Sequence, residues 1–227
     1  MWTGKKVVLQ QNRDRSLTVS AFLFAAISGA LFLVLGNRVA HHPPSAADLW
    51  LSLRLHDRSD LIAWIFTWSC YVYVLGPLCI ALVVVALRYP QWRNRVVFSL
   101  TLLVVTWAAS DAFQRVFMRP RRIDWLVKHE TAFSYPSTHG DISLVVYGFW
   151  AVLLLASDLP KSSKIAAAAV LFCIMLGTWW ARLSLGAHYP SDILGGVLLA
   201  LSLIFAGFGV CSLTGIPLAG RGATRWD

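Results

Sequence analysis

The sequence predicts an all-α integral membrane protein in which a bundle of six transmembrane helices forms a single domain over residues 1–227. Of the 227 residues, 57% are hydrophobic and only 14% are charged, and the mean hydropathy is +0.62. Such a composition is typical of proteins that cross a bilayer. Uncharged stretches of nearly spanning length recur along the chain. The 11 tryptophans suit the aromatic belts at the two membrane interfaces.

Three of the predicted spans lie in the first half of the chain. A basic N-terminal tail precedes the first one. A mixed segment follows it, and the helical spacing of apolar residues over 46–55 predicts a short interfacial helix there. A short basic loop at 88–95 separates the next two. The three spans are predicted at 16–37, 61–87 and 96–118.

The other three spans are predicted at 139–157, 165–183 and 191–213. The uncharged parts of the fourth and fifth cover only 16 and 17 residues (142–157 and 165–181), short of the ~20 that a spanning helix needs. These helices reach that length only if their ends include His139, Asp141 or Arg182. The sequence therefore predicts that polar side chains from distant segments lie at one depth.

The basic residues predict the orientation of the bundle. Six spans place both termini on one side, and the loops on that side hold 11 of the 20 Lys and Arg residues. Of the nine outside, five cluster near the polar segments described below, which leaves a bias of 11 to 4. The positive-inside rule then predicts cytoplasmic termini and a site on the outer face of the cytoplasmic (inner) membrane.

The net charge of +9 does not indicate a nucleic-acid-binding protein, because the basic residues lie between apolar stretches and form no extended basic domain. The four cysteines are scattered through apolar segments without a C-x-x-C pair. This spacing predicts neither a metal site nor a disulfide framework.

Three charged side chains interrupt the apolar sequence between the fifth and sixth spans. Arg182, His188 and Asp192 follow the spacing R-x5-H-x3-D, and each is costly at membrane depth unless it is paired or hydrated. A carboxylate four residues after a histidine can hold one ring nitrogen and leave the other free to attack. The arginine can bind an oxyanion such as phosphate. An ordinary polar loop explains each residue singly but not all three together.

A second polar segment, Pro136-Ser137-Thr138-His139, precedes the fourth span. Proline and serine before an apolar stretch predict a helix start, whose free backbone N–H groups favour phosphate. Ser137 adds a donor, and His139 can give a proton to a leaving oxygen. The alternative is a capped helix with an interfacial histidine.

A third segment at the end of the third span is strongly basic. It contains Arg115, Arg119, Arg121 and Arg122. For each arginine alone, the alternative is a side chain at a helix end that extends to the interface between membrane and water. A cluster on the outer face, however, opposes the positive-inside trend and favours an anion site.

These segments resemble the three motifs of the type 2 phosphatidic acid phosphatase (PAP2) superfamily, which are K-x6-RP, PSGH and SR-x5-H-x3-D. Arg182, His188 and Asp192 match the third motif, with Ala181 in place of its serine. The second motif is matched with Thr138 in place of its glycine.

The first motif is matched less closely. Arg121 takes the place of its arginine, and Arg122 replaces its proline. Gln114 replaces its lysine, and the neighbouring Arg115 is a candidate substitute for that charge. By motif the resemblance covers residues 114–192, and the six-span layout extends it over nearly the whole chain.

The resemblance implies a phosphatase that needs no metal or other cofactor. It implies that His188 is the nucleophile and forms a phosphohistidine, that Asp192 orients it, and that His139 is the general acid. The residues implied to hold the phosphoryl oxygens are Arg121, Ser137, Thr138 and Arg182. Further candidates for phosphate contacts are Arg115, Arg119, Arg122 and Gln114.

The sequence therefore predicts a membrane lipid phosphatase whose substrate is a lipid phosphate or diphosphate. Five arginines near one site exceed what a single phosphate monoester needs, and the short loop 122–135 leaves little protein to cover a sugar head group. Both features favour undecaprenyl (polyprenyl) diphosphate. The alternatives are a phosphatidate, phosphatidylglycerophosphate or lipid A phosphatase, a lipid phosphotransferase, and a non-enzymatic anion transporter or binding protein. The last ranks lower because the charges gather at one face, not at the midplane.

Overall fold

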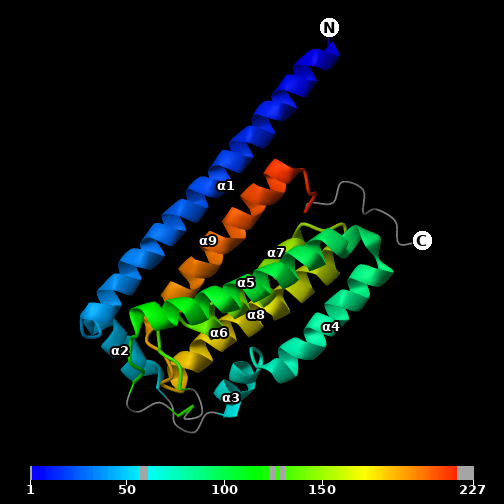
Figure 1. Ribbon diagram of the computed structural model, residues 1–227. Helices are drawn as coiled ribbons and strands as arrows, with labels where there is room; N and C mark the ends of the chain where they lie inside the picture. Colours follow the sequence, from blue (N-terminus) through cyan, green and yellow to red (C-terminus); the bar gives the residue numbers. More distant parts are fainter. Residues whose placement is uncertain (1, 57–60, 123–125, 128–130, 219–227) are drawn as a thin grey trace.

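The computed structural model describes residues 2–56, 61–122, 126–127 and 131–218, with side chains from residue 15 onward (Figure 1). These residues form helices and connecting loops, and no strand occurs among them. The elements are α1 (Trp2–His41), α2 (Ala46–Leu55), α3 (Leu61–Trp68), α4 (Val72–Arg88), η1 (Pro90–Trp92), α5 (Arg93–Phe117), α6 (Thr138–Ser143), η2 (Leu144–Gly148), α7 (Phe149–Leu155), α8 (Lys161–Ser184) and α9 (Pro190–Thr214).

Five helical stretches in the described part are long and apolar enough to cross a membrane, or six if the bent pair α3–α4 is counted as one span. The five are Arg15–His41, Pro90–Phe117, Thr138–Leu155, Lys161–Ser184 and Pro190–Thr214. Each of the five overlaps a predicted span. The protein is thus an all-α multi-pass membrane protein.

The second predicted span, 61–87, is not one helix, which corrects that expectation. It breaks between α3 and α4 with a bend of 42°. At the break, the backbone N–H of Tyr71 donates to the carbonyl of Trp68 only three residues back. The carbonyl of Ser69 instead accepts from the Tyr147 hydroxyl over 2.6 Å, and the Ser69 hydroxyl pairs with that of Thr178 over 2.8 Å. Polar side chains of neighbouring elements thus satisfy the broken turn inside the protein, as a bilayer requires.

The fourth predicted span is a continuous helical rod with a π-helical turn, η2, between α6 and α7. A Cβ on Gly148, the last residue of η2, would lie 2.7 Å from the sulfur of Met175 on α8. Glycine therefore lets this rod pack closely against α8. Tyr147 of the same turn reaches the break between α3 and α4, so η2 and that break are fixed to each other.

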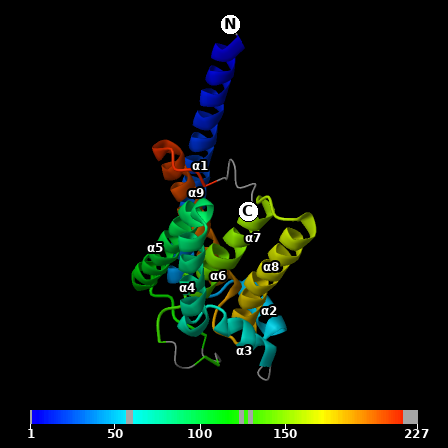
Figure 2. The ribbon, with the colours of Figure 1, turned by 90° about the vertical axis from the view of Figure 1, so that its right-hand side faces the viewer.

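The helix ends lie at two opposite ends of the bundle (Figures 1 and 2). The N-terminal end of α1 and the C-terminal end of α9 lie at one end of the bundle. At the other end lie α2, α3 and the N-terminal end of α9. The two long helices α1 and α9 run side by side, and α6 packs on α9.

The predicted interfacial helix at 46–55 is present as α2 and buries its polar face. Asp48 and Ser52 are buried, whereas Leu49, Trp50 and Leu53 are exposed. This pattern is the reverse of that in a water-soluble protein. It suits a helix that turns apolar side chains toward lipid and polar side chains toward the bundle.

Candidate active site

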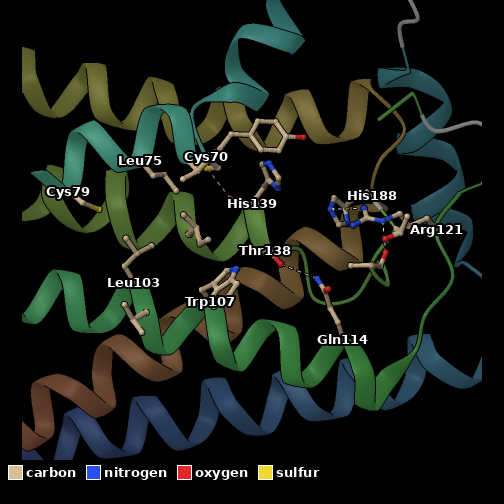
Figure 3. A pocket seen from close by; sticks show the side chains of 17 residues that line it. Cys70, Leu75, Cys79, Leu103, Trp107, Gln114, Arg121, Thr138, His139 and His188 are labelled. Carbon is tan, nitrogen blue, oxygen red and sulfur yellow. Dashed lines mark hydrogen bonds between the residues drawn. The ribbon is translucent and has the colours of Figure 1, made fainter. Parts of the chain in front are cut away.

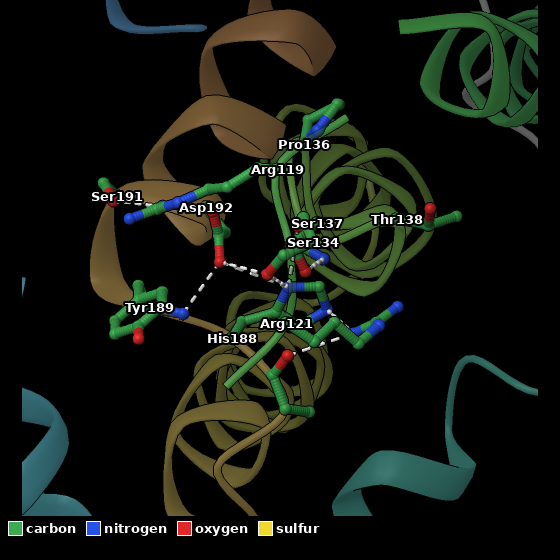
Figure 4. A network of polar contacts seen from close by, with 12 residues as sticks. Arg119, Arg121, Ser134, Pro136, Ser137, Thr138, His188, Tyr189, Ser191 and Asp192 are labelled. Atoms are coloured by element: carbon green, nitrogen blue, oxygen red, sulfur yellow. Dashed lines mark hydrogen bonds and ion pairs between the residues drawn. The ribbon is translucent and has the colours of Figure 1, made fainter. Parts of the chain in front are cut away.

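The second and third motifs meet where the N-terminal ends of α6 and α9 touch (Figure 4). The backbone N–H of Ser137 donates to the carbonyl oxygen of Asp192 over 3.0 Å. A Cβ on Gly196 would lie only 2.5 Å from the carbonyl oxygen of Ser137. The absence of a side chain at Gly196 therefore permits the close approach that joins the two motifs.

His188 lies in the loop before α9 and is 1% exposed. Its Nδ1 is 2.9 Å from the carbonyl oxygen of Ser134 and 3.6 Å from Oδ2 of Asp192. A carbonyl oxygen can only accept, so Nδ1 carries the proton and Nε2 keeps its lone pair. Ser134, which the sequence did not single out, thus holds the ring directly. The expected hydrogen bond from Nδ1–H of His188 to Asp192 is instead a longer electrostatic contact.

Asp192 is fully buried and is itself held by three donors. Its Oδ1 accepts from the guanidinium of Arg119 over 2.5 Å. Its Oδ2 accepts from the Ser134 hydroxyl over 2.5 Å and from the Tyr189 backbone N–H over 2.8 Å. The last contact is part of the capping box of α9. The carboxylate therefore has a fixed direction beside Nδ1 of His188.

The guanidinium of Arg121 lies beside Nε2 of His188. Its Nη1 is 3.3 Å from Nε2 of His188 and donates to the carbonyl of Ala187 over 3.0 Å. Its Nε donates to the carbonyl of Ala132 over 2.8 Å. These contacts hold a positive charge where a phosphoryl group attached to Nε2 would sit.

The surroundings of His188 favour its neutral form. Burial, and after it the positive charge of Arg121, lower its pKa to about 4 against the opposing effect of Asp192. Arg182 lowers the pKa further, so its charge also reaches this ring. At pH 7 the imidazole is therefore neutral and can act as a nucleophile.

The start of α6 carries the second motif. The hydroxyl oxygen of Ser137 caps the helix by accepting from the Gly140 N–H over 3.2 Å. Gln114 donates to the Pro136 carbonyl over 2.8 Å and to the Thr138 hydroxyl over 3.0 Å. At the position of the family's lysine, this chain therefore has a neutral side chain that fixes the loop before α6.

The arginines that were predicted to gather at the site have different surroundings. Arg115 does not have the surroundings expected of a phosphate-binding residue. Its side chain is 75% exposed and forms an ion pair with Asp111 over 2.8 Å. Arg119 is buried but contacts Asp48 and Asp192. Thus the structure does not bring Arg115 to the histidines, and it gives Arg119 two carboxylates of the protein as partners.

The remaining two arginines of the predicted set are also buried. Arg122 lies over the ring of Tyr189, 5.8 Å from its centroid. Arg182 is 0% exposed at the end of α8, and its carbonyl accepts from the backbone N–H groups of Ala187 and His188. Arg121 and Arg182 are therefore the arginines whose charges act on His188.

A cavity of about 660 Å³ extends from the histidines to the outside of the bundle, where exposed side chains such as Trp107 line it (Figure 3). Its polar end is formed by Arg121, His139 and His188, with Gln114 and Thr138 beside them. The rest is largely apolar and lies between α4 and α5, where its walls include Leu75, Cys79, Leu103, Val104 and Trp107. This division suits an amphiphile with a phosphate at one end and a hydrocarbon chain along the other.

A metal site is not evident in residues 2–56, 61–122, 126–127 and 131–218, where no three His, Cys, Asp or Glu side chains come together. The chemistry available from the described residues is that of a neutral imidazole, a second histidine in the same cavity, and arginine charge. Together these groups can bind a phosphate, attack it and protonate a leaving oxygen.

Comparisons with known proteins agree with this chemistry. The family model of the PAP2 superfamily matches residues 96–212. Phosphatidylglycerophosphatase B of Bacillus subtilis (strain 168) is 36% identical over 81 residues, which are 34% of this chain and 38% of that protein. The match thus spans well under half of that relative's length.

A crystal structure of a transmembrane PAP2 type phosphatidylglycerolphosphate phosphatase from Bacillus subtilis has the same fold. It superposes with a TM-score of 0.65 at 23% identity, and the match covers 88% of this chain and 98% of that one. The family model alone covers more than half of the chain. The chain therefore belongs to the PAP2 superfamily.

Proposed function

We propose that the protein is a membrane lipid phosphatase that hydrolyses a lipid phosphate monoester through a phosphohistidine at His188. The observation that carries this proposal is the position of Nε2 of His188. It keeps its lone pair, faces Arg121 at 3.3 Å and lines a cavity whose remainder is apolar. A soluble phosphate ester has no hydrocarbon chain that could fill an apolar groove of this kind.

In the proposed first step, Nε2 of His188 attacks phosphorus and the bond from phosphorus to the lipid oxygen breaks. His139 gives its proton to that oxygen, and the lipid alcohol leaves. The positive charge that the imidazole gains is balanced by Asp192, while Arg121 and Arg182 balance the phosphoryl oxygens. The backbone N–H groups at the start of α6, with Ser137 and Thr138, supply further donors.

In the second step, His139 takes a proton from water, which attacks the phosphohistidine. The bond from phosphorus to Nε2 breaks, inorganic phosphate leaves, and both histidines return to their starting states. A phosphotransferase would use a lipid hydroxyl in place of water. Analysis of products separates the two outcomes, because only hydrolysis releases inorganic phosphate.

For the substrate we propose a glycerophospholipid monoester of the phosphatidylglycerophosphate type, since both relatives carry that activity in their names. The argument for undecaprenyl diphosphate needed five arginines at the site. Arg115 and Arg119 are already paired with carboxylates of the protein, which removes part of that argument. Two arginine charges next to His188 match one phosphate better than two.

The test is a panel of lipids in detergent micelles with the purified protein. It contains phosphatidylglycerophosphate, phosphatidate, undecaprenyl diphosphate and farnesyl diphosphate. We expect phosphate release in excess EDTA, and a higher kcat/KM for a monoester than for either diphosphate. A higher value for a diphosphate would reverse the substrate proposal. Binding without turnover of any member would favour an anion transporter or binding protein.

His188→Ala and His139→Ala test the mechanism. The first variant should abolish turnover, because the nucleophile is lost. The second should lose about 10²- to 10⁴-fold, the usual contribution of general acid–base catalysis. That loss should shrink with p-nitrophenyl phosphate, whose leaving group needs no proton. Near wild-type rates for His188→Ala would refute the phosphohistidine route.

A further inference from the structure

Asp48, on α2, reaches the proposed active site from 143 residues away in the sequence. Its side chain is buried, at 4% exposure. Its Oδ1 accepts from the backbone N–H of Ser191 over 2.9 Å, and its Oδ2 accepts from the Ser191 hydroxyl over 2.7 Å. Ser191 is the second residue of α9, so Asp48 caps the helix whose third residue is Asp192.

Arg119 joins Asp48 to Asp192. Its Nη2 donates to Oδ2 of Asp48 over 3.3 Å, and its Nη1 donates to Oδ1 of Asp192 over 2.5 Å and to the Ser191 hydroxyl over 2.8 Å. Its guanidinium also lies 4.5 Å above the ring centroid of Tyr189. One buried cation is therefore shared between two buried carboxylates (Figure 4 shows Arg119, Ser191 and Asp192).

The charge of this group has a consequence for His188. Two carboxylates and one guanidinium leave one negative charge in excess, and the N-terminal end of α9 helps to stabilise it. If Asp48 were neutral, the charge of Arg119 would cancel that of Asp192. In the proposed reaction His188 keeps its proton on Nδ1 and bonds phosphorus through Nε2, so the ring becomes positive. An excess negative charge beside Nδ1 stabilises that cation.

We propose that Asp48 is a positioning residue that shares Arg119 with Asp192 and so keeps Asp192 electrostatically available to His188. This inference rests on the proposed function, because it concerns the positive charge that forms on His188. It also gives α2 a role: its exposed face carries Trp50 and Leu53 toward lipid, while its buried face supplies a charge to the site.

The first test compares Asp48→Asn with wild type. Asparagine keeps the shape and one oxygen for the Ser191 N–H, so the protein should fold, which thermal unfolding in detergent checks. We expect kcat to fall about 10-fold or more, as for other groups that stabilise transition-state charge, with KM nearly unchanged. Asp111→Asn is the matched control, because Asp111 is a half-exposed carboxylate that pairs with Arg115, and it should keep wild-type kcat. A kcat for Asp48→Asn equal to that of wild type would overturn the inference.

A second variant separates charge from structure. Asp48→Asn with Arg119→Gln restores one excess negative charge, so kcat should rise above that of Asp48→Asn alone. A purely structural role predicts the opposite, since each change removes contacts. A double variant no better than the single one would therefore count against the inference.

Vanadate affinity, followed by tryptophan fluorescence, gives a readout without turnover, because bound vanadate occupies the place of the transferring phosphoryl group. Asp48→Asn should weaken vanadate binding several-fold relative to wild type. Equal binding would overturn the inference even if no lipid on the panel is hydrolysed. Absence of vanadate binding to wild type would instead refute the proposed function, and the inference with it.

Discussion

At the scale of single residues, the protonation and orientation of His188 are determined more by Ser134 and Arg121 than by the residues of its own motif. The Ser134 carbonyl fixes which ring nitrogen carries the proton, and Arg121 faces the other one. Burial and Arg121 together keep the ring neutral well below the ordinary histidine pKa of about 6.5. Because the pKa is lowered, the nucleophilic form persists as the pH falls from 6.5 to about 4.

This predicts a specific pH dependence. The rate with p-nitrophenyl phosphate should be measured between pH 4 and 7 and corrected for the substrate dianion, whose pKa is about 6. The remaining acid limb of kcat/KM should lie near pH 4, where His188 gains its proton. In Arg121→Gln, which removes a positive charge, this limb should move upward. An enzyme limb at pH 6.5 in wild type would show that His188 is not the group that titrates.

Arg115 and Arg121 make a matched pair that tests which arginines serve the site. Arg121→Gln should lower kcat/KM by about 10²-fold or more, because it removes a charge beside the reacting nitrogen. Arg115→Gln should change it less than about two-fold, since an exposed ion pair contributes little. Steady-state assays of both variants in the same micelles measure the difference. Equal losses would mean that Arg115 approaches the site in solution.

The sequence singled out His139, His188, Asp192 and Arg182 as candidates because their spacing is itself the signal. It chose Arg121 over Arg119 by motif alignment, and the contact between Arg121 and Nε2 supports that choice. Ser134 acts through a backbone carbonyl, which has no residue preference. Asp48 lies 143 residues from its partner Ser191, and no spacing rule links them. A contact through a backbone carbonyl and a contact between distant residues leave no pattern in the sequence, so these two could be found only in the folded chain.

At the scale of elements, the break between α3 and α4 is the main departure from the predicted spans. It places Tyr71 on the wall of the cavity, where its ring makes a T-shaped contact with His139 at a centroid distance of 5.2 Å. This contact holds the imidazole of His139 at the wall of the cavity. A continuous helix over 61–87 would offer no such turn, so the break serves the second histidine.

Tyr71→Leu tests this role of the break. We expect turnover of a lipid phosphate to fall several-fold, because His139 is less well held as the proton donor. The loss with p-nitrophenyl phosphate should be smaller, since its leaving group needs no proton. Tyr73→Leu is the matched control, because Tyr73 is 81% exposed two residues along the chain. Equal losses with both substrates would indicate a general structural effect instead.

The contact between α6 and α9 gives a second prediction at this scale. In Gly196→Ala the new methyl group would lie 2.5 Å from the Ser137 carbonyl oxygen and 3.0 Å from the Asp141 backbone nitrogen. Backbone atoms cannot move aside cheaply, so we expect a loss of about 1–3 kcal/mol of stability and a large loss of activity. Gly76→Ala, with nothing within 4 Å of the new methyl group, should unfold at the wild-type temperature or above. Thermal unfolding in detergent compares the two.

At the scale of the whole molecule, the bundle separates its two ends by function. All the residues proposed for chemistry lie at the end that holds α2, α3 and the start of α9, and the N-terminal end of α1 and the C-terminal end of α9 lie at the other (Figure 1). The connection between α7 and α8, with Lys161 and Lys164 at the start of α8, belongs to that other end (Figure 2). The proposed site and the start of α8 thus lie at opposite ends of the helix bundle.

The positive-inside rule then predicts that the catalytic end faces outward. In a variant with Cys70, Cys79, Cys173 and Cys211 replaced, one cysteine is introduced at Thr131, which is exposed at the mouth of the cavity, or at Ser162, which is exposed at the start of α8. A membrane-impermeant maleimide on intact cells should label Thr131→Cys at once, and Ser162→Cys only after lysis. The reverse pattern would place the histidines on the cytoplasmic side, and the lipid would then be drawn from the inner leaflet. Because each cysteine is compared with itself before and after lysis, a difference in labelling reports the side of the membrane and not the reactivity of the thiol.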